Sequence, residues 1–239
     1  MSDATTILIT GTSKGIGLAL ARHYVEAGRD VAGCSRGASP LDPVEGPGTY
    51  RHYQCDITDE QAVREMVMAV DAQAGGLGLL VNNAGVPLAQ PGLVTSGKRL
   101  TELLEINVTG TFNVTREVVR AMLRRGSGRI VNLSSIAAQL ETPGNAAYGA
   151  SKAAITRLTH QLVSEVGAAG ITANTVGVSL VREGGMYESL SPAARERYEA
   201  RLASAEPVPI EELAFIIDFF ASPEAGSITG QTLYLGGPS

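Results

Sequence analysis

The stretch Thr6-Ile-Leu-Ile-Thr-Gly-Thr-Ser-Lys-Gly-Ile-Gly17 decides the fold, because a strand signal runs straight into a glycine turn and then a helix. Its first residues, Thr6 to Thr10, form a β-branched run that is typical of a buried strand. Glycines with the spacing GxxxGxG follow, and apolar residues at helical spacing continue until Gly28. Backbone N–H groups and the helix dipole at such a junction can hold a phosphate. We therefore expect a nucleotide site here; the alternative is a glycine-rich turn without a ligand.

The second predicted strand, residues 30–36, ends in Ser35 and Arg36. In dinucleotide-binding folds, an acidic residue near this end bonds the ribose 2′-hydroxyl, whereas an arginine suits a 2′-phosphate. The sequence has no carboxylate at this end, and Lys14 in the glycine turn adds a second cation. These charges favour NADP over NAD; the alternative is a pair of solvated surface charges.

Strand and helix patterns alternate along the rest of the chain. Strands are also expected at 50–55, 77–81, 129–133, 172–176 and 229–236, and helices at about 59–74, 100–125, 146–169 and 211–220. The helix at 59–74 can be capped by Thr58 or Asp59. This alternation predicts one α/β domain over residues 1–239, with a doubly wound, seven-stranded parallel sheet of the Rossmann type. Ligands of such sheets bind at the carboxyl ends of the strands.

The segment Tyr148-Gly-Ala-Ser-Lys152 falls inside one of these helices. A spacing of four residues places Tyr148 and Lys152 on one helix face, with their Cβ atoms about 5–6 Å apart. An ammonium group close to a phenol favours the phenolate, which makes a proton donor and acceptor suited to a carbonyl/alcohol pair. The alternative is a surface lysine beside a half-buried tyrosine.

The composition narrows the class of protein. The chain has 239 residues and a net charge of −5, and it lacks the basic stripe expected of a nucleic-acid partner. Cys34 and Cys55 lie in apolar runs and are interpreted as small buried side chains in a reducing compartment, not as a disulfide. The histidines lack metal-ligand spacing. Without a signal-peptide pattern or a membrane-spanning apolar run, we expect a soluble, cytoplasmic protein.

In this order, the motifs resemble those of the short-chain dehydrogenase/reductase family over nearly the whole chain. The closest resemblance is to its β-ketoacyl carrier-protein reductases. The matching motifs are TGxxxGIG at Thr10–Gly17, NNAG at Asn82–Gly85, a helix asparagine at Asn107, a serine at Ser135, and YxxxK at Tyr148 and Lys152.

The resemblance implies a role for each matching residue. Tyr148 would exchange a proton with the substrate oxygen, and Lys152 would favour the phenolate and bond the nicotinamide ribose. Ser135 would polarise the substrate carbonyl, and Asn107 would hold a water that links Lys152 to solvent. Asn145 matches a position that often faces the substrate, so the implied substrate contacts are Ser135, Asn145 and Tyr148.

The resemblance also implies a set of residues that bind NADP(H). Asp56 and Ile57 match a pair that contacts the adenine, and backbone groups of Val181 are suited to the nicotinamide carboxamide. The complete set is Gly11, Ser13, Lys14, Gly15, Ile16, Gly17, Ser35, Arg36, Asp56, Ile57, Asn83, Ala84, Gly85, Tyr148, Lys152 and Val181.

The chain departs from the family pattern after the sixth predicted strand. The family usually has Pro-Gly there, followed by a threonine that helps to hold the carboxamide. This chain reads Gly177-Val-Ser-Leu-Val-Arg-Glu183, so Glu183 stands near the place of the threonine. A substrate lid is expected at about 178–209, with a helical piece at 192–202 whose arginines suit either an anionic substrate or solvent.

Together these inferences predict an NADPH-dependent reductase of a ketone, or the reverse alcohol dehydrogenase. The substrate would be a small carbonyl or alcohol, free or bound to a carrier protein, in a biosynthetic pathway. The alternative is a non-catalytic NADP(H)-binding sensor or scaffold, which would not need all of Asn107, Ser135, Tyr148 and Lys152. The resemblance further implies a homo-oligomer, a tetramer or a dimer. No metal, nucleic acid or membrane partner is expected.

Overall fold

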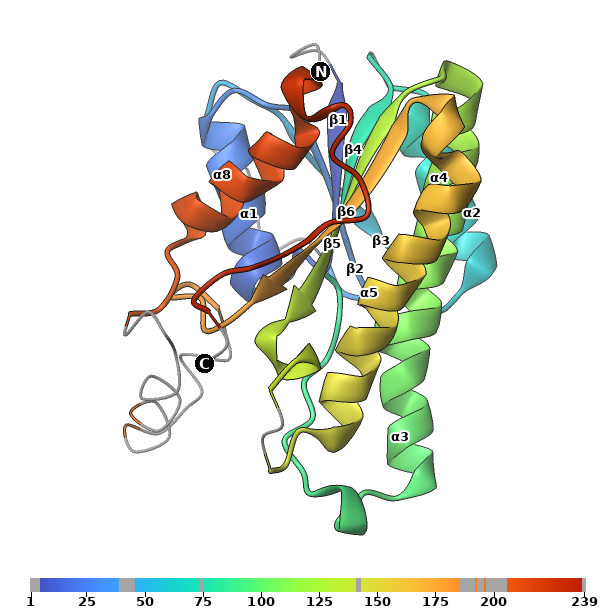
Figure 1. The fold of residues 1–239 in the computed structure, drawn as a ribbon. Helices are drawn as coiled ribbons and strands as arrows, with labels where there is room; N and C mark the ends of the chain where they lie inside the picture. The colour runs from blue at the N-terminus through green and yellow to red at the C-terminus, as the bar shows by residue number, and fades with distance from the viewer. Residues whose placement is uncertain are drawn as a thin grey trace.

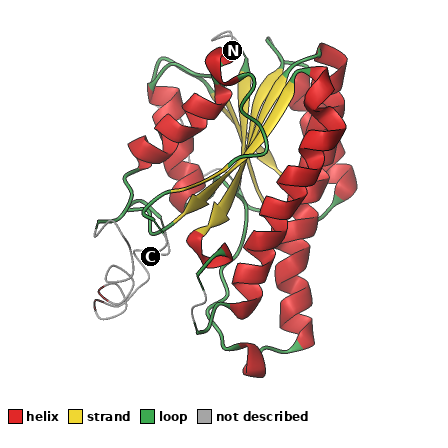
Figure 2. Ribbon diagram, in the orientation of Figure 1, coloured by secondary structure: helices red, strands yellow, loops and turns green. Residues whose placement is uncertain are grey.

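Seven parallel strands form one twisted sheet at the centre of the molecule (Figures 1 and 2). The computed structural model describes residues 5–38, 46–73, 75–140, 143–184, 192, 196 and 206–237. The strands are β1 (Thr6–Thr10), β2 (Val31–Ser35), β3 (Tyr50–Gln54), β4 (Leu77–Asn82), β5 (Gly128–Ser135), β6 (Ile171–Val178) and β7 (Thr232–Tyr234). They lie in the order β3-β2-β1-β4-β5-β6-β7, with every pair parallel. The predicted Rossmann-type, doubly wound sheet is therefore confirmed.

Helices cover both faces of this sheet (Figure 1). On one face lie α1 (Gly15–Glu26) and α8 (Ile210–Ala221); on the other lie α2 (Glu60–Asp71), α4 (Thr111–Arg125) and α5 (Ala146–Val166). The short helix α3 (Gly97–Leu104) leads into α4. Single helical turns occur at η1 (Gly92–Val94), η3 (Ile136–Ala138), η4 (Gly167–Ala169) and η5 (Pro223–Ala225). Within the described ranges, no helix combines the length and apolarity needed to cross a membrane.

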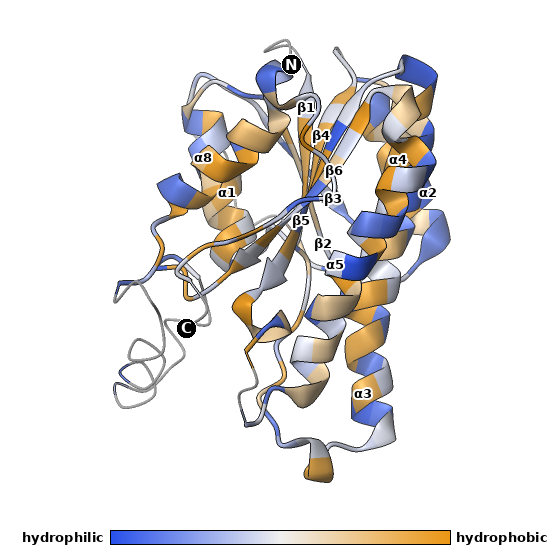
Figure 3. Cartoon of the chain, viewed as in Figure 1, coloured by the Kyte–Doolittle hydropathy of each residue, from blue (hydrophilic) through white to orange (hydrophobic). Residues whose placement is uncertain are grey.

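The inner strands β1 and β4 are buried along their whole length because each face of the sheet is covered by a helix layer. In β1, Ile7 and Ile9 belong to the core shared with α1 and α8, whereas Leu8 belongs to the core shared with α2 and α4. The helices show both hydrophobic and hydrophilic positions in Figure 3, and their buried hydrophobic residues belong to these two cores. Two cores separated by the sheet follow from this alternation.

The long helix predicted over residues 100–125 is interrupted. A π-helical turn, η2 (Glu105–Gly110), separates α3 from α4. Asn107 lies within this turn, and its side chain pairs with the backbone of Val86. Val86 N–H donates to Asn107 Oδ1 at 2.8 Å, and Asn107 Nδ2 donates to the Val86 carbonyl at 3.1 Å. These two bonds fix a widened turn, a feature frequent at functional sites.

Two other predictions concern the ends of elements. Asp59, not Thr58, caps α2, since its side chain accepts from Gln61 N at 2.9 Å and Ala62 N at 3.1 Å. The seventh strand was predicted over 229–236 and is shorter. Ahead of it, Gln231 N donates to the Asn174 side chain at 2.9 Å, so a side chain takes over part of the ladder.

Candidate active site

A cavity of about 700 Å³ lies at the carboxyl ends of the strands, beside β1 and β4, where the strand order reverses. This is the place where doubly wound sheets bind their ligands. Most of the predicted site residues line it together: Gly11, Ser13, Lys14, Gly15, Ile16, Ser35, Arg36, Asp56, Ile57, Asn83, Ala84, Gly85, Ser135, Tyr148, Lys152 and Val181. Gly17, Asn107 and Asn145 are not among the lining residues.

Residues of the glycine turn line part of this cavity. Gly11 and Gly15 have φ angles of +76° and +58°, a left-handed backbone that favours glycine. The N-cap residue of α1, Lys14, makes no side-chain capping bond, so it leaves the first N–H groups of the helix available to an anion. A Cβ atom at Gly17 would overlap the carbonyl oxygen of Gly11 and the amide of Asn83. Gly17 therefore permits close packing of α1 against the turn and does not line the cavity.

The NNAG motif is bonded directly to the glycine turn. Thr10 Oγ1 accepts from Asn83 N at 3.0 Å and from Ala84 N at 2.9 Å. In return, Asn83 Nδ2 donates to the carbonyl of Thr10 at 2.8 Å. A Cβ atom at Gly11 would lie 2.8 Å from Ala84 Cα, so only glycine allows this approach. These bonds bring the ends of β1 and β4 together as one wall of the cavity.

Ser135 and Tyr148 reach the cavity from different elements. Ser135 ends β5, and its Oγ accepts from Ala137 N at 3.2 Å as η3 begins. Tyr148 lies in the first turn of α5. A Cβ atom at Gly149 would lie 2.5 Å from the carbonyl oxygen of Ala137. The glycine after the tyrosine thus lets α5 pack against η3, and this contact keeps the two hydroxyl-bearing residues at one cavity.

Lys152 is buried beneath Tyr148. Its Nζ lies 5.9 Å from the centre of the tyrosine ring and donates to the carbonyl of Leu133 at 3.0 Å. Burial disfavours the ammonium form and lowers the pKa of Lys152 to about 8. A group with this pKa exchanges protons readily near neutral pH.

Asn107 lies next to this pair but behind the cavity wall. Its Nδ2 donates to Ser151 Oγ at 3.0 Å, and Ser151 Oγ donates to the Tyr148 carbonyl at 2.7 Å. A Cβ atom at Gly85 would lie 3.1 Å from Asn107 Oδ1 and 3.5 Å from Lys152 Nζ. Asn107 is thereby attached to the helix that carries both predicted proton-transfer residues.

Backbone contacts join the segment after β6 to Val208, and we call these contacts the clamp. Val181, which lines the cavity, forms an isolated parallel bridge with Val208. Val208 N donates to the Leu180 carbonyl at 2.8 Å, and Arg182 N donates to the Val208 carbonyl at 3.0 Å. The predicted helical piece at 192–202 lies outside the described residues, apart from Pro192 and Glu196.

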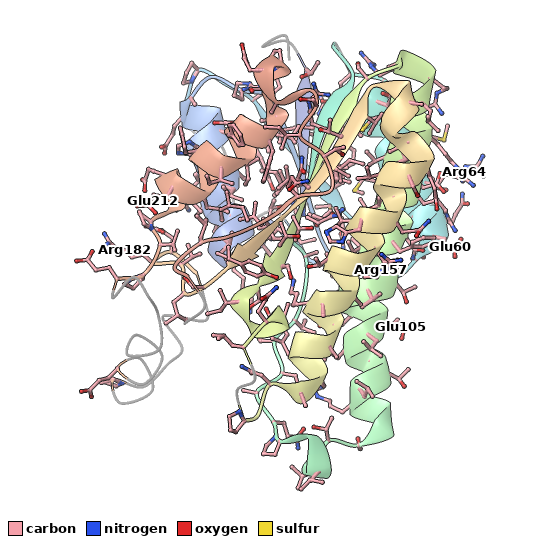
Figure 4. All side chains as sticks on the ribbon, in the orientation of Figure 1. Glu60, Arg64, Glu105, Arg157, Arg182 and Glu212 are labelled. Carbon is pink, nitrogen blue, oxygen red and sulfur yellow. The ribbon has the colours of Figure 1, made fainter. Side chains whose placement is uncertain are left out.

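Glu183, which stands where the family has a threonine, has a separate structural contact. Its carboxylate accepts from the backbone N–H of Ile210 at 3.1 Å. It thus caps α8, whose own N-cap residue, Pro209, has no side-chain acceptor. Nearby, the side chains of Arg182 and Glu212 point outward at the edge of the molecule (Figure 4).

Asn145 is the N-cap residue of α5, and its substrate contact stays a prediction.

Sequence reasoning missed several cavity residues because no motif marks them. These are Val86, Pro87, Ile106, Leu133 and Ser134; Val178, Ser179, Leu180 and Gly184 also line the cavity but fall within the lid expected at about 178–209. Cys34 and Cys55 also line the cavity and are buried and unpaired, as predicted. Burial raises the pKa of Cys34 to about 12 and that of Cys55 to about 11, so both remain small neutral side chains. Over the described ranges, no cluster of His, Cys, Asp and Glu has the makings of a metal site.

Comparison with known proteins finds similar proteins over nearly the whole chain. The family model described as short chain dehydrogenase matches residues 5–194. The chain belongs to the short-chain dehydrogenase family. It is 30% identical over 238 residues to the 3-oxoacyl-(acyl-carrier-protein) reductase FabG of Vibrio cholerae, which covers 98% of this chain and 97% of that protein.

Solved structures of short-chain dehydrogenases share the fold. A short-chain type dehydrogenase/reductase from Mycobacterium ulcerans superposes with a TM-score of 0.90 at 28% identity, covering 98% of this chain and 92% of the other. An NAD⁺-bound xylitol dehydrogenase gives 0.89 at 29% identity, covering 98% of both chains. The family consists of oxidoreductases that use a nicotinamide cofactor. Because one of these neighbours holds NAD⁺, family membership does not choose between NAD and NADP.

The cavity residues fit a nicotinamide dinucleotide. At one end lie the glycine turn and the cations of Lys14 and Arg36; at the other lie Ser135, Tyr148 and Lys152. Asp56 is the sole carboxylate among the described lining residues, and its Oδ1 accepts from Thr58 N and Oγ1 at 3.0 and 2.8 Å. The donors of the turn suit phosphate oxygens, and the charge at this end is suited to an anion.

The burial of Lys152 predicts a specific pH dependence of stability for the cofactor-free protein. A lysine in an unfolded chain has a pKa near 10.4, against about 8 here. Below pH 8, Lys152 is protonated in both the folded and the unfolded protein, so the folded protein bears the whole cost of burying the charge. As pH rises from 8 towards 10.4, the folded state is neutral and this cost falls by about 1.4 kcal/mol per pH unit.

We therefore expect the stability advantage of Lys152→Met over wild type to shrink by about 2–3 kcal/mol between pH 8 and 10. Chemical denaturation across this range measures the difference. Lys98→Met, at an exposed position of α3, is the control and should show a much flatter difference. A Lys152→Met difference that stays constant up to pH 10 would contradict the buried ammonium.

Proposed function

We propose that this protein is an NADPH-dependent oxidoreductase that reduces a ketone to a secondary alcohol or catalyses the reverse reaction. One observation carries the proposal. Ser135, Tyr148 and Lys152 line the same cavity as residues of the glycine turn. The 3-oxoacyl-(acyl-carrier-protein) reductase relative supports a carbonyl substrate, either carried by such a protein or free. The alternative, a sensor or scaffold without turnover, would not need Ser135, Tyr148 and Lys152 together.

The binding step would use the residues of the glycine turn and the second strand. Lys14 and Arg36 would meet the phosphates, together with the N–H groups at the start of α1. The absence of a carboxylate at the end of β2 and the presence of Arg36 favour a 2′-phosphate. When bound, the cofactor supplies a hydride for the carbonyl carbon.

The proton would come from the cluster on α5. The phenol of Tyr148 and the hydroxyl of Ser135 would both donate to the carbonyl oxygen, where negative charge develops as the hydride arrives. The phenol proton then moves to that oxygen and completes the alcohol. Lys152 favours the phenolate that remains, and Asn107 would hold the water through which a proton returns from solvent.

The chain would act as one catalytic domain, with residues 178–209 as a lid. The cavity contacts of Val178, Ser179, Leu180, Val181 and Gly184 support this placement. A cytoplasmic location is in keeping with two buried, unpaired cysteines. A screen of ketones, quinones and carrier-protein thioesters with NADPH would define the substrate.

We also propose a homo-oligomer, either a tetramer or a dimer. A groove of about 420 Å³ runs between α4 and α5 and is lined by both helices. Phe112 and Leu123 stand at this groove with 46% and 47% of their surfaces exposed. Both lie on α4, and apolar side chains left exposed beside a groove in this way suit a second copy of the same helix pair.

Replacing the phenol hydroxyl tests the catalytic assignment. In Tyr148→Phe, turnover of a substrate found in the screen should fall by about 10²- to 10⁴-fold, because no phenol remains to protonate the oxygen. NADPH affinity, measured by fluorescence titration, should change little. Tyr53→Phe is the matched control: it removes a hydroxyl that accepts from Gln73 Nε2 at 2.7 Å, and turnover should stay near the wild-type rate. Undiminished turnover in Tyr148→Phe would overturn the role of this residue.

Removing one cation tests the choice of cofactor. Arg36→Ala should weaken NADPH binding by about 10- to 100-fold, since one charged hydrogen bond to a phosphate is lost. NADH binding should change by less than about threefold. Fluorescence titration of both nucleotides gives the four dissociation constants, and Arg51→Ala, an exposed cation on β3, controls for general charge. Tighter wild-type binding of NADH than of NADPH would contradict the proposed cofactor.

The oligomer has its own test. A charge at Leu123, in Leu123→Arg, should shift the protein to a smaller species in light scattering at micromolar concentration, because it places an ion in an apolar interface. Met68→Arg, at an exposed apolar position of α2, should leave the mass unchanged. A monomeric wild-type protein would contradict the proposed assembly.

A further inference from the structure

A chain of polar side chains crosses the sheet beside the proposed phosphate site. Thr12 Oγ1 lies 2.8 Å from Tyr50 OH, and Tyr50 OH lies 3.0 Å from His52 Nδ1. At the far side of the ring, His52 Nε2 lies 3.2 Å from Ser35 Oγ. Thr12 belongs to the glycine turn, Tyr50 and His52 to β3, and Ser35 to the end of β2. Of the four, Ser35 is the one that lines the cavity.

The chain can pass over β2 because residue 33 has no side chain. Gly33 is paired with His52 in the β2–β3 ladder. A Cβ atom there would overlap Tyr50 OH and would lie 2.5 Å from Thr12 Oγ1. Thr12 is fully buried, so its hydroxyl needs an internal partner. Gly33 thus permits a hydrogen-bonded connection between the glycine turn and the edge strand.

The direction of the hydrogen bonds is set at Gly37. His52 Nε2 lies 3.0 Å from the carbonyl oxygen of Gly37, which can only accept. Nε2 must therefore carry a hydrogen, whether the ring is neutral or charged. This single hydrogen is shared between the Gly37 carbonyl and Ser35 Oγ, so Ser35 Oγ acts as an acceptor towards His52 and its own hydrogen points elsewhere. In the structure, that hydrogen is donated to Gly37 at 3.2 Å.

A hydroxyl held in this way discriminates between two ligands. A 2′-phosphate offers oxygens that accept a hydrogen bond and carry charge, so Ser35 O–H can turn from Gly37 to meet it. A ribose 2′-hydroxyl is uncharged, so the hydrogen bond it receives from Ser35 is weaker, and its own hydrogen needs an acceptor. The end of β2 has no carboxylate to take that hydrogen. The arrangement favours the phosphorylated nucleotide.

We propose that His52 is a positioning residue for cofactor choice: it holds the Ser35 hydroxyl as a hydrogen-bond donor towards the 2′-phosphate. This inference rests on the proposed NADPH dependence and deepens it. His52 acts from behind Ser35, and its effect on binding passes through the Ser35 hydroxyl. Its loss should therefore change the preference between the two nucleotides, whereas damage to the fold would weaken both.

The test measures the ratio of the NADH and NADPH dissociation constants by fluorescence titration. His52→Leu should lower this ratio by about five- to tenfold, mainly by weakening NADPH. His52→Gln can place an amide N–H near the position of Nε2 and should keep the ratio within about twofold of wild type. In a Ser35→Ala background, His52→Leu should change the ratio by less than about twofold, because the positioned hydroxyl is gone. Tyr53→Phe, on the same strand, is the control for an unrelated hydroxyl and should leave the ratio unchanged.

Each contrary result has a separate meaning. A wild-type preference for NADPH that persists in His52→Leu would overturn the role of His52 and leave the proposed cofactor standing. Equal weakening of both nucleotides, or a loss of preference that is just as large in the Ser35→Ala background, would do the same. A wild-type preference for NADH would overturn the proposed cofactor and the role of His52 together.

Discussion

The bonds between Thr10 and the Asn83–Ala84 backbone are the constraint on which the site depends. Neighbouring parallel strands diverge after their last ladder bond, and at the point of strand reversal their following loops turn to opposite faces. Here one threonine hydroxyl accepts from two N–H groups of the adjacent loop, at 3.0 and 2.9 Å. The crevice between the strands therefore has a fixed wall before any ligand arrives. Gly11 is required because a side chain would separate the two loops.

The second half of the site is fixed by buried polar contacts across the sheet. Asn82 Nδ2 donates to Asn132 Oδ1 at 2.7 Å, and Asn132 Nδ2 donates to Thr159 Oγ1 at 2.8 Å. This ladder runs from β4 through β5 to α5, whereas apolar packing alone would allow α5 to slide. Tyr148 and Lys152, on the same helix, inherit that register. A precise position matters most for Lys152, whose burial alters its proton affinity.

Elements whose signal lies in a few neighbouring residues could be predicted from the sequence. Contacts between residues far apart along the chain could not. The strand at Thr6–Thr10 and the cap at Asp59 depend on a few neighbouring residues, and the structure agrees with both. The π turn at Asn107 was not predicted because the two bonds that hold it go to the backbone of Val86, in a loop far from it in the sequence. Glu183 was compared with a threonine, but its partner, Ile210, lies in another segment. The Thr12–Tyr50–His52 chain needs three strands to meet, and no motif in the sequence encodes this.

The clamp formed by Val181, Val208 and the Glu183–Ile210 bond has a consequence for how such a protein can change over evolution. It holds the two ends of the intervening chain side by side, independently of what that chain contains. Once the ends of a loop are fixed, doubling its length costs only about 0.6 kcal/mol in closure entropy. Insertions, deletions and exchanges between these ends therefore leave the cofactor wall and α8 largely undisturbed.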